Sequence, residues 1–192
     1  MLKPQNIFLI GMPGAGKSTV GKSLANILDM PFIDTDDEIV CRNGVEIATI
    51  FEIEGEAGFR QREAALIDEL TQQNGMVMAT GGGAILHPEN RVALSARGLV
   101  VYLHADVDTL VKRTSQMGGK RNKRPLLSNA NVHERLTGLL AVRGPLYNEI
   151  ADLTININHT NRLQLARVLA SEIAEYFTQS TTYSQFTLST KN

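Results

Sequence analysis

Cysteine is almost absent from this 192-residue sequence, which contains only Cys41. One thiol cannot form an internal disulfide, and it cannot supply the ligand sets of zinc fingers or iron–sulfur clusters. A disulfide-framed secreted domain is therefore excluded. A chain of this length can bury roughly 70% of its unfolded surface, so a hydrophobic core can hold it together without such crosslinks.

An excess of charge and a long hydrophobic run are missing as well. The 19 Lys+Arg stand against 20 Asp+Glu, which leaves a formal net charge of -1. A strongly basic nucleic-acid-binding protein is therefore not expected. No apolar run approaches the roughly 20 residues of a membrane helix, and residues 1–6 (MLKPQN) do not resemble a signal peptide. We expect a cytoplasmic protein that binds neither nucleic acid nor membranes.

Short apolar runs alternate with segments of helical periodicity along the chain. The expected strands are residues 7–10, 31–34, 76–79, 99–103 and 153–157. The expected helices are residues 17–28, 36–73 with breaks near Gly44 and Gly55, 106–114, 132–142 and 163–177. This alternation predicts an α/β fold with a parallel sheet flanked by helices. We expect a single domain over residues 1–177, a mobile loop over residues 115–130 and a disordered, Ser/Thr-rich tail over residues 178–192.

The strongest motif lies at residues 11–18, which read GMPGAGKS and match the pattern Gly-x-x-x-x-Gly-Lys-Ser/Thr. Its glycines allow backbone N–H groups to point at phosphate oxygens. Lys17 can reach the β- and γ-phosphates, and the Ser18 hydroxyl can bind Mg²⁺. The motif predicts nucleotide phosphate binding. The switch and guanine-reading motifs of GTPases are missing, as is the dinucleotide pattern Gly-x-Gly-x-x-Gly.

Polar and glycine-rich turns follow two of the expected strands. Asp34 and Asp36 come after the second strand, and residues 81–83 (GGG) come after the third. If the chain is still extended at Asp34, the two carboxylates share one face and could hold Mg²⁺ or orient an acceptor hydroxyl. The alternative is a helix N-cap. The glycines either approach a ligand closely or form a plain turn.

Arginines supply a second group of candidates. Arg60 and Arg143 are either solvated charges or bidentate partners for a substrate carboxylate. Residues 112–124 carry six Lys and Arg side chains without one acid. This run is a solvated or nucleic-acid-binding loop, or a lid that brings positive charge over a triphosphate.

Together these motifs resemble shikimate kinase. The matching segments are GMPGAGKST at 11–19, DTD at 34–36, GEAGFR at 55–60, TGGG at 80–83, RPLL at 124–127 and RGPLY at 143–147. The resemblance covers about residues 5–175. It implies a phosphate-binding-loop fold like that of nucleoside monophosphate kinases, with five parallel strands in the order 2-3-1-4-5. It further implies a shikimate-binding region over about residues 34–62 and a mobile lid over about residues 115–130.

The resemblance also implies an activity and its residues. The reaction would move the γ-phosphoryl group of ATP to the 3-hydroxyl of shikimate, with Mg²⁺ as cofactor, in aromatic amino acid biosynthesis. The implied catalytic residues are Asp36, Lys17 and Arg124. The implied nucleotide contacts are Gly14, Ala15, Gly16, Lys17, Ser18, Thr19, Arg113, Arg124 and Thr160. The implied shikimate contacts are Asp36, Arg60, Gly82, Gly83 and Arg143, and the implied Mg²⁺ ligands are Ser18 and, through water, Asp34. We expect a monomer.

Three other functions stay open at this point. One is another small-metabolite kinase of the same fold, such as a gluconate kinase. A nucleoside monophosphate kinase is less favoured, because its acceptor is a phosphate rather than a hydroxylated carboxylate. The third is an ATP-binding module without turnover, which ADP release would distinguish from any kinase.

Overall fold

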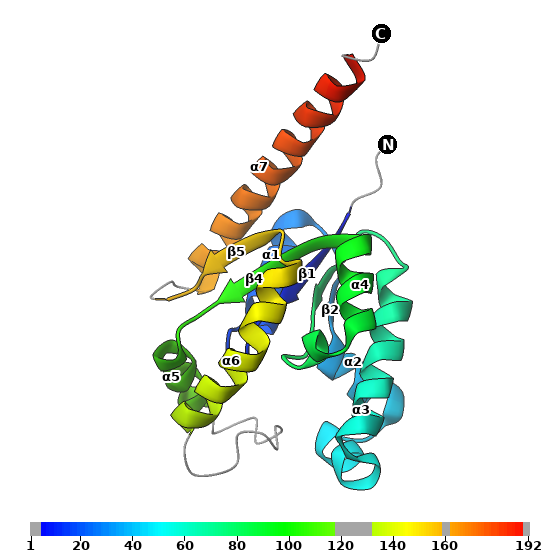
Figure 1. Ribbon diagram of the computed structural model, residues 1–192, viewed down its shortest axis with the longest axis vertical. Helices are drawn as coiled ribbons and strands as arrows, with labels where there is room; N and C mark the ends of the chain where they lie inside the picture. The colour runs from blue at the N-terminus through cyan, green and yellow to red at the C-terminus, as the bar shows by residue number, and fades with distance from the viewer. Residues whose placement is uncertain (1–4, 118–131, 159–161, 190–192) are drawn as a thin grey trace.

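A five-stranded parallel sheet forms the centre of the protein in the computed structural model, which describes residues 5–117, 132–158 and 162–189 (Figure 1). The strands are β1 (Asn6–Ile10), β2 (Phe32–Asp34), β3 (Val77–Ala79), β4 (Gly98–His104) and β5 (Leu153–Asn156). Their order is β2-β3-β1-β4-β5, and every neighbouring pair is parallel. The five predicted strands and the predicted order are confirmed.

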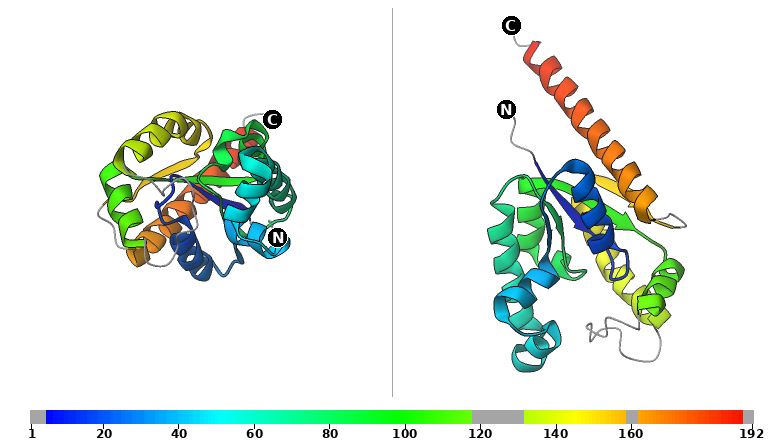
Figure 2. Two further views of the ribbon diagram at one scale, coloured as in Figure 1. Left: turned by 90° about the horizontal axis from the view of Figure 1, so that it is seen from below. Right: turned by 180° about the vertical axis from the view of Figure 1, so that it is seen from behind.

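Helices cover both faces of the sheet (Figure 2). They are α1 (Lys17–Leu28), α2 (Thr35–Asn43), α3 (Ile47–Thr71), α4 (Pro88–Arg97), α5 (Val107–Met117), α6 (Val132–Ile150) and α7 (Arg162–Ser189), with a short 3-10 helix η1 (Ala84–Leu86). α1 and α7 pack against each other on one face, while α4 and α6 pack over β4 on the other. This arrangement follows from right-handed crossovers that leave β1 and β3 in opposite directions across the sheet.

Burial explains the apolar runs of the sequence. The side chains of β1 and β3 are buried throughout, as expected for central parallel strands covered on both faces. β5 alternates between half-buried and exposed residues, which fits its position at the edge of the sheet. β2 forms the opposite edge and is only three residues long.

The predicted helix breaks at two glycines are confirmed. Gly44 ends α2 with φ 67°, in the left-handed region that favours glycine. Gly55 has φ 71° inside α3, so α3 is two helical pieces joined at a kink. Arg60 lies in the second piece, after the kink.

The last helix continues into the segment for which the sequence predicts a disordered tail. α7 continues through Ser189 and projects beyond the sheet, as Figure 1 shows. A helix that is already nucleated by packed turns gains one hydrogen bond for each residue added. Within the described residues, no helix has the length and apolar character to cross a membrane.

Candidate active site

The phosphate loop joins β1 to α1 and depends on three glycines. Gly11, Gly14 and Gly16 have φ values of 144°, 85° and 89°. A Cβ at Gly11 would lie 2.7 Å from the Leu103 carbonyl oxygen. Among the described residues no side chain caps α1 at Gly16, and the partial positive charge of a helix N-terminus favours an anion there. The loop therefore has the geometry of a phosphate site.

Lys17 begins α1, and its side chain is held inside the phosphate loop. Its buried Nζ donates to the carbonyl oxygens of Gly11 at 2.7 Å and of Met12 at 3.0 Å. The half-buried Ser18 and Thr19 follow in the same turn of the helix. The predicted phosphate contacts at residues 14–19 thus span the end of the phosphate loop and the first turn of α1.

Arg113 of α5 fastens two distant segments to the phosphate loop. It donates from Nη1 to the Ala15 carbonyl at 3.1 Å and from Nη2 to the Ile157 carbonyl at 2.9 Å. These bonds bring α5 and the chain just after β5 against the loop. The position fits the predicted contact of Arg113 with the nucleotide.

An acceptor loop, defined here as residues 80–83, follows β3 beside the phosphate loop. The Gly81 N–H donates to Thr35 Oγ1 at 3.0 Å, which ties the acceptor loop to α2. A Cβ on Gly82 would lie 2.8 Å from Pro13 Cδ. The acceptor loop therefore packs directly on the phosphate loop, and glycine at position 82 permits that approach.

The structure corrects one premise about Asp34 and Asp36. The chain is not extended across both residues, because β2 ends at Asp34 and α2 begins at Thr35. Asp34 is the N-cap of α2 and accepts a hydrogen bond from the Asp36 N–H at 3.0 Å. The capping interpretation of Asp34 is thus confirmed. Asp36 still faces the acceptor loop, since a Cβ on Gly81 would lie 2.8 Å from its Oδ1.

Arg60 reaches the acceptor loop from α3. Its guanidinium lies against Gly83 and is ion-paired with Glu63 at 2.6 Å and Glu56 at 3.2 Å. Burial lowers the pKa of Arg60, but the charge of Glu63 and the hydrogen bonds to both acids more than offset this, so the net shift is upward. Arg60 is therefore a fixed cation beside Gly83.

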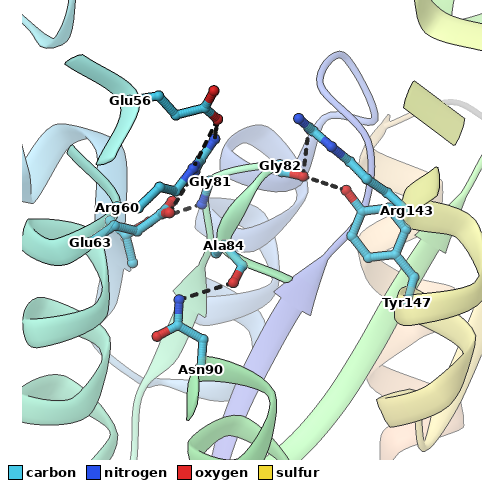
Figure 3. Close-up of polar contacts among 10 residues, drawn as sticks. Glu56, Arg60, Glu63, Gly81, Gly82, Ala84, Asn90, Arg143 and Tyr147 are labelled. Atoms are coloured by element: carbon cyan, nitrogen blue, oxygen red, sulfur yellow. Dashed lines mark hydrogen bonds and ion pairs between the residues drawn. The ribbon is translucent and has the colours of Figure 1, made fainter. Parts of the chain in front are cut away.

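Arg143 reaches the same loop from α6, on the other side (Figure 3). Its side chain is buried, and Nη1 donates to the Gly82 carbonyl at 2.9 Å. Tyr147, one helical turn further on, donates to the same carbonyl at 2.6 Å. Arg60 and Arg143 thus approach the glycines from opposite sides (Figure 3).

Two residues of this region were missed in the sequence. Glu63 is fully buried, and burial raises the pKa of its carboxyl group, with the Arg60 charge opposing the shift. Its spacing of three residues from Arg60, and that of four between Arg143 and Tyr147, place each pair on one helix face. That spacing is a signal that could have found them. Their burial depends on contacts distant in sequence.

Some predicted residues lie outside the described part of the chain. These are Arg124, Thr160 and most of the predicted lid over residues 115–130. Residues 115–117 belong to the end of α5. The predicted roles of Arg124 and Thr160 therefore remain predictions.

The arrangement defines a class of protein. A phosphate loop opens at the carboxyl end of β1, and an acceptor loop flanked by two arginines and two carboxyl groups lies next to it. This places the protein among the phosphate-binding-loop kinases, in which catalysis rests on positioning and charge stabilisation.

Comparison with known proteins gives the family. The family model described as "Shikimate kinase" matches residues 13–180. A shikimate kinase of Actinobacillus pleuropneumoniae serotype 5b is 50% identical over 175 residues, which cover 91% of this chain and 96% of that protein. The solved shikimate kinase of Acinetobacter baumannii in complex with shikimate is 43% identical, with a TM-score of 0.85 over 90% of this chain and 94% of that one. The chain belongs to the shikimate kinase family.

A gluconokinase of Sinorhizobium meliloti is similar in fold but has low sequence identity. It is 19% identical, with a TM-score of 0.56 over 92% of this chain and 97% of that one. At that identity the similarity shows a shared fold alone. The comparison therefore gives the gluconate alternative no support beyond the fold.

Proposed function

We propose that this kinase transfers the γ-phosphoryl group of ATP to the 3-hydroxyl of shikimate, as a step of aromatic amino acid biosynthesis. Membership of the family supports the proposal, as does the Acinetobacter baumannii relative that holds shikimate. The observation that carries it is the approach of Arg60 and Arg143 to one glycine loop beside the phosphate loop. Two guanidinium groups suit an acceptor that carries a carboxylate.

The arginines would bind the carboxylate of shikimate. A guanidinium presents planar N–H donors that match the two oxygens of a carboxylate, which a lysine cannot do. Arg60 is oriented by Glu63, and Arg143 by the Gly82 carbonyl. Both groups are therefore positioned before the substrate arrives, which lowers the entropy cost of binding. The Gly82 and Gly83 backbone would complete the pocket.

Asp36 would bind the ring hydroxyls and accept the proton of the attacking one. It lies in the first turn of α2 and faces Gly81 of the acceptor loop. A carboxylate beside the acceptor loop, which packs on the phosphate loop, can orient a hydroxyl for in-line attack. The proton would pass from the hydroxyl oxygen to an Asp36 oxygen as the new P–O bond forms, while the bond from the γ-phosphorus to the bridging oxygen breaks and ADP leaves.

Lys17 and Arg124 would neutralise the phosphate charge. Lys17 lies within the loop that would hold the β- and γ-phosphates. Arg124 would approach from the lid, where a cation can act mainly on the transition state. Arg113 would contact the nucleotide beside Ala15, and Thr160 would lie on the adenine side.

Magnesium would be held by Ser18 and, through water, by Asp34. The donor set fits, because a hydroxyl and a carboxylate offer the oxygen ligands that Mg²⁺ requires. Across the described residues, no group of three or more His, Cys, Asp or Glu could hold a metal alone. This agrees with a cation carried mainly by the phosphates. When bound, Mg²⁺ would offset the negative charge of the phosphates.

We further propose that the protein acts as a monomer in the cytoplasm. Light scattering at assay concentration would test this, and a dimer required for activity would contradict it.

The central experiment is an ADP-release assay with ATP and Mg²⁺ against shikimate, gluconate and AMP. We expect shikimate alone to support rapid release. Faster release with gluconate or AMP would refute the proposed acceptor. If the protein binds nucleotide but releases no ADP with any acceptor, the result would favour an ATP-binding module without turnover.

A further inference from the structure

The carbonyl of Gly82 receives two hydrogen bonds from one face of α6. Tyr147 Oη donates at 2.6 Å and Arg143 Nη1 donates at 2.9 Å (Figure 3). Tyr147 is 1% exposed and Arg143 is 4% exposed, so water does not replace either donor. Leaving a buried carbonyl without a hydrogen-bond donor costs free energy, and here two donors bond to the same carbonyl oxygen.

The two donors differ in what else they must do. Arg143 is assigned to the acceptor carboxylate under the proposed function, on which this inference rests. An arginine that alone held the Gly82 carbonyl would have to divide its donors between that carbonyl and the substrate. The Tyr147 hydroxyl has a single proton and gives it to the carbonyl.

We propose that Tyr147 is a positioning residue: its hydroxyl fixes the Gly82 carbonyl so that Arg143 can orient its guanidinium toward the carboxylate of the acceptor. The Gly82 backbone then stays packed on Pro13 of the phosphate loop while Arg143 engages the substrate. Tyr147 acts through Gly82 and Arg143 and does not touch the reacting atoms.

The ring and the hydroxyl of Tyr147 have separate roles. The ring stacks on Tyr102 with centroids 4.9 Å apart, so its position is set by packing. Burial raises the pKa of Tyr147, which keeps the hydroxyl protonated and able to donate near neutral pH. Removing only the oxygen therefore deletes the bond to Gly82 and leaves the packing in place.

Tyr102 provides a matched control. Its ring is equally buried in the same stack, but its Oη lies 3.1 Å from His104 Nδ1 and bonds away from the acceptor loop. Tyr102→Phe and Tyr147→Phe delete the same atom from neighbouring rings. A difference between them reports the Gly82 contact rather than the general effect of losing a buried hydroxyl.

We expect Tyr147→Phe to raise KM for shikimate about tenfold, the scale of one lost buried hydrogen bond. KM for ATP should change less than about twofold, and Tyr102→Phe should leave both constants within about twofold. Equal shikimate KM values in the two variants would overturn the inference. So would a parallel rise of both KM values in Tyr147→Phe, since a structural defect would act on both sites.

A double-mutant cycle provides a second test of the inference. If Tyr147 acts through Arg143, the losses in shikimate binding from Tyr147→Phe and Arg143→Lys should be non-additive, and additive losses would contradict the inference. A wild-type protein that does not phosphorylate shikimate would instead refute the proposed function. The two failures are therefore distinguishable.

Discussion

Replacing Gly81 by alanine tests the acceptor side of the site with one methyl group. The new Cβ would lie 2.5 Å from Glu63 Oε1 and 2.8 Å from Asp36 Oδ1, where ordinary contact begins at 3.4 Å. Each carboxyl oxygen must therefore retreat by about 0.6–0.9 Å, as judged from those separations. Gly81 is not among the glycines with positive φ, so alanine strains the contacts and not the backbone.

The displacement should reduce catalysis more than stability. Misplacing a catalytic group by about 1 Å can cost about 10²-fold, so we expect kcat/KM for shikimate to fall by about 10–10²-fold. Overpacking a tight site costs about 1–3 kcal/mol of unfolding free energy. At about 2–4 °C for each kcal/mol in a chain of this size, Tm should fall by several degrees.

Gly138→Ala is the control for this substitution. Gly138 lies on the exposed face of α6, where an added Cβ meets no atom within 4 Å. Alanine there should leave kinetics unchanged and raise stability by about 0.5–1 kcal/mol. ADP release and thermal unfolding measure both effects. Wild-type kcat/KM and Tm in Gly81→Ala would refute the packing of the two carboxyl groups on Gly81.

Four further predictions concern other parts of the chain. Asp36→Asn should keep ATP binding and lower kcat by about 10²–10⁴-fold, and a near-normal kcat would reduce Asp36 to a helix-terminal residue. Arg143→Lys should raise KM for shikimate with little change for ATP, because lysine lacks the planar fork, and an unchanged shikimate KM would place Arg143 outside the pocket. Arg124→Ala should lower kcat by about 10²–10⁴-fold at saturating substrates, whereas Arg121→Ala should not. Equal, small losses of kcat in both variants would mean that the lid contributes only general positive charge and that Arg124 has no specific catalytic role. Deleting residues 178–192 should leave kcat and Tm nearly unchanged, and a Tm loss of more than about 5 °C would show that this end of the chain supports the fold.

The layout of the fold was predictable from local patterns. Continuous apolar runs at residues 7–10 and 99–103 indicated central strands, and alternation at residues 153–157 indicated an edge strand. The structure shows both patterns, because central strands of the parallel sheet are buried on two faces and the edge strand on one. The strand order came from the resemblance to the family, since periodicity alone does not say which strands are neighbours.

The site was predictable only in part. The phosphate loop is contiguous in sequence, so its residue pattern indicated its geometry. The sequence indicated the short β2 and offered N-capping as one of two interpretations of the aspartates, but a strand of three residues gives no periodicity to decide whether the chain is still extended at Asp36. Glu63 resembled a solvated helix charge, and its burial comes from contacts with segments far along the chain.

The two edges of the sheet have a consequence for the behaviour of the protein at high concentration. β2 offers three residues of backbone and β5 offers four, so either edge presents a short row of hydrogen-bonding groups. So short a row is a poor template for a strand from another molecule, because only a few hydrogen bonds form to offset the entropy that the added strand loses. The long apolar strands β1 and β4, which would be effective templates, are enclosed between neighbours. The strand order thus protects the chain against edge-to-edge aggregation while it keeps the most apolar segments at the centre.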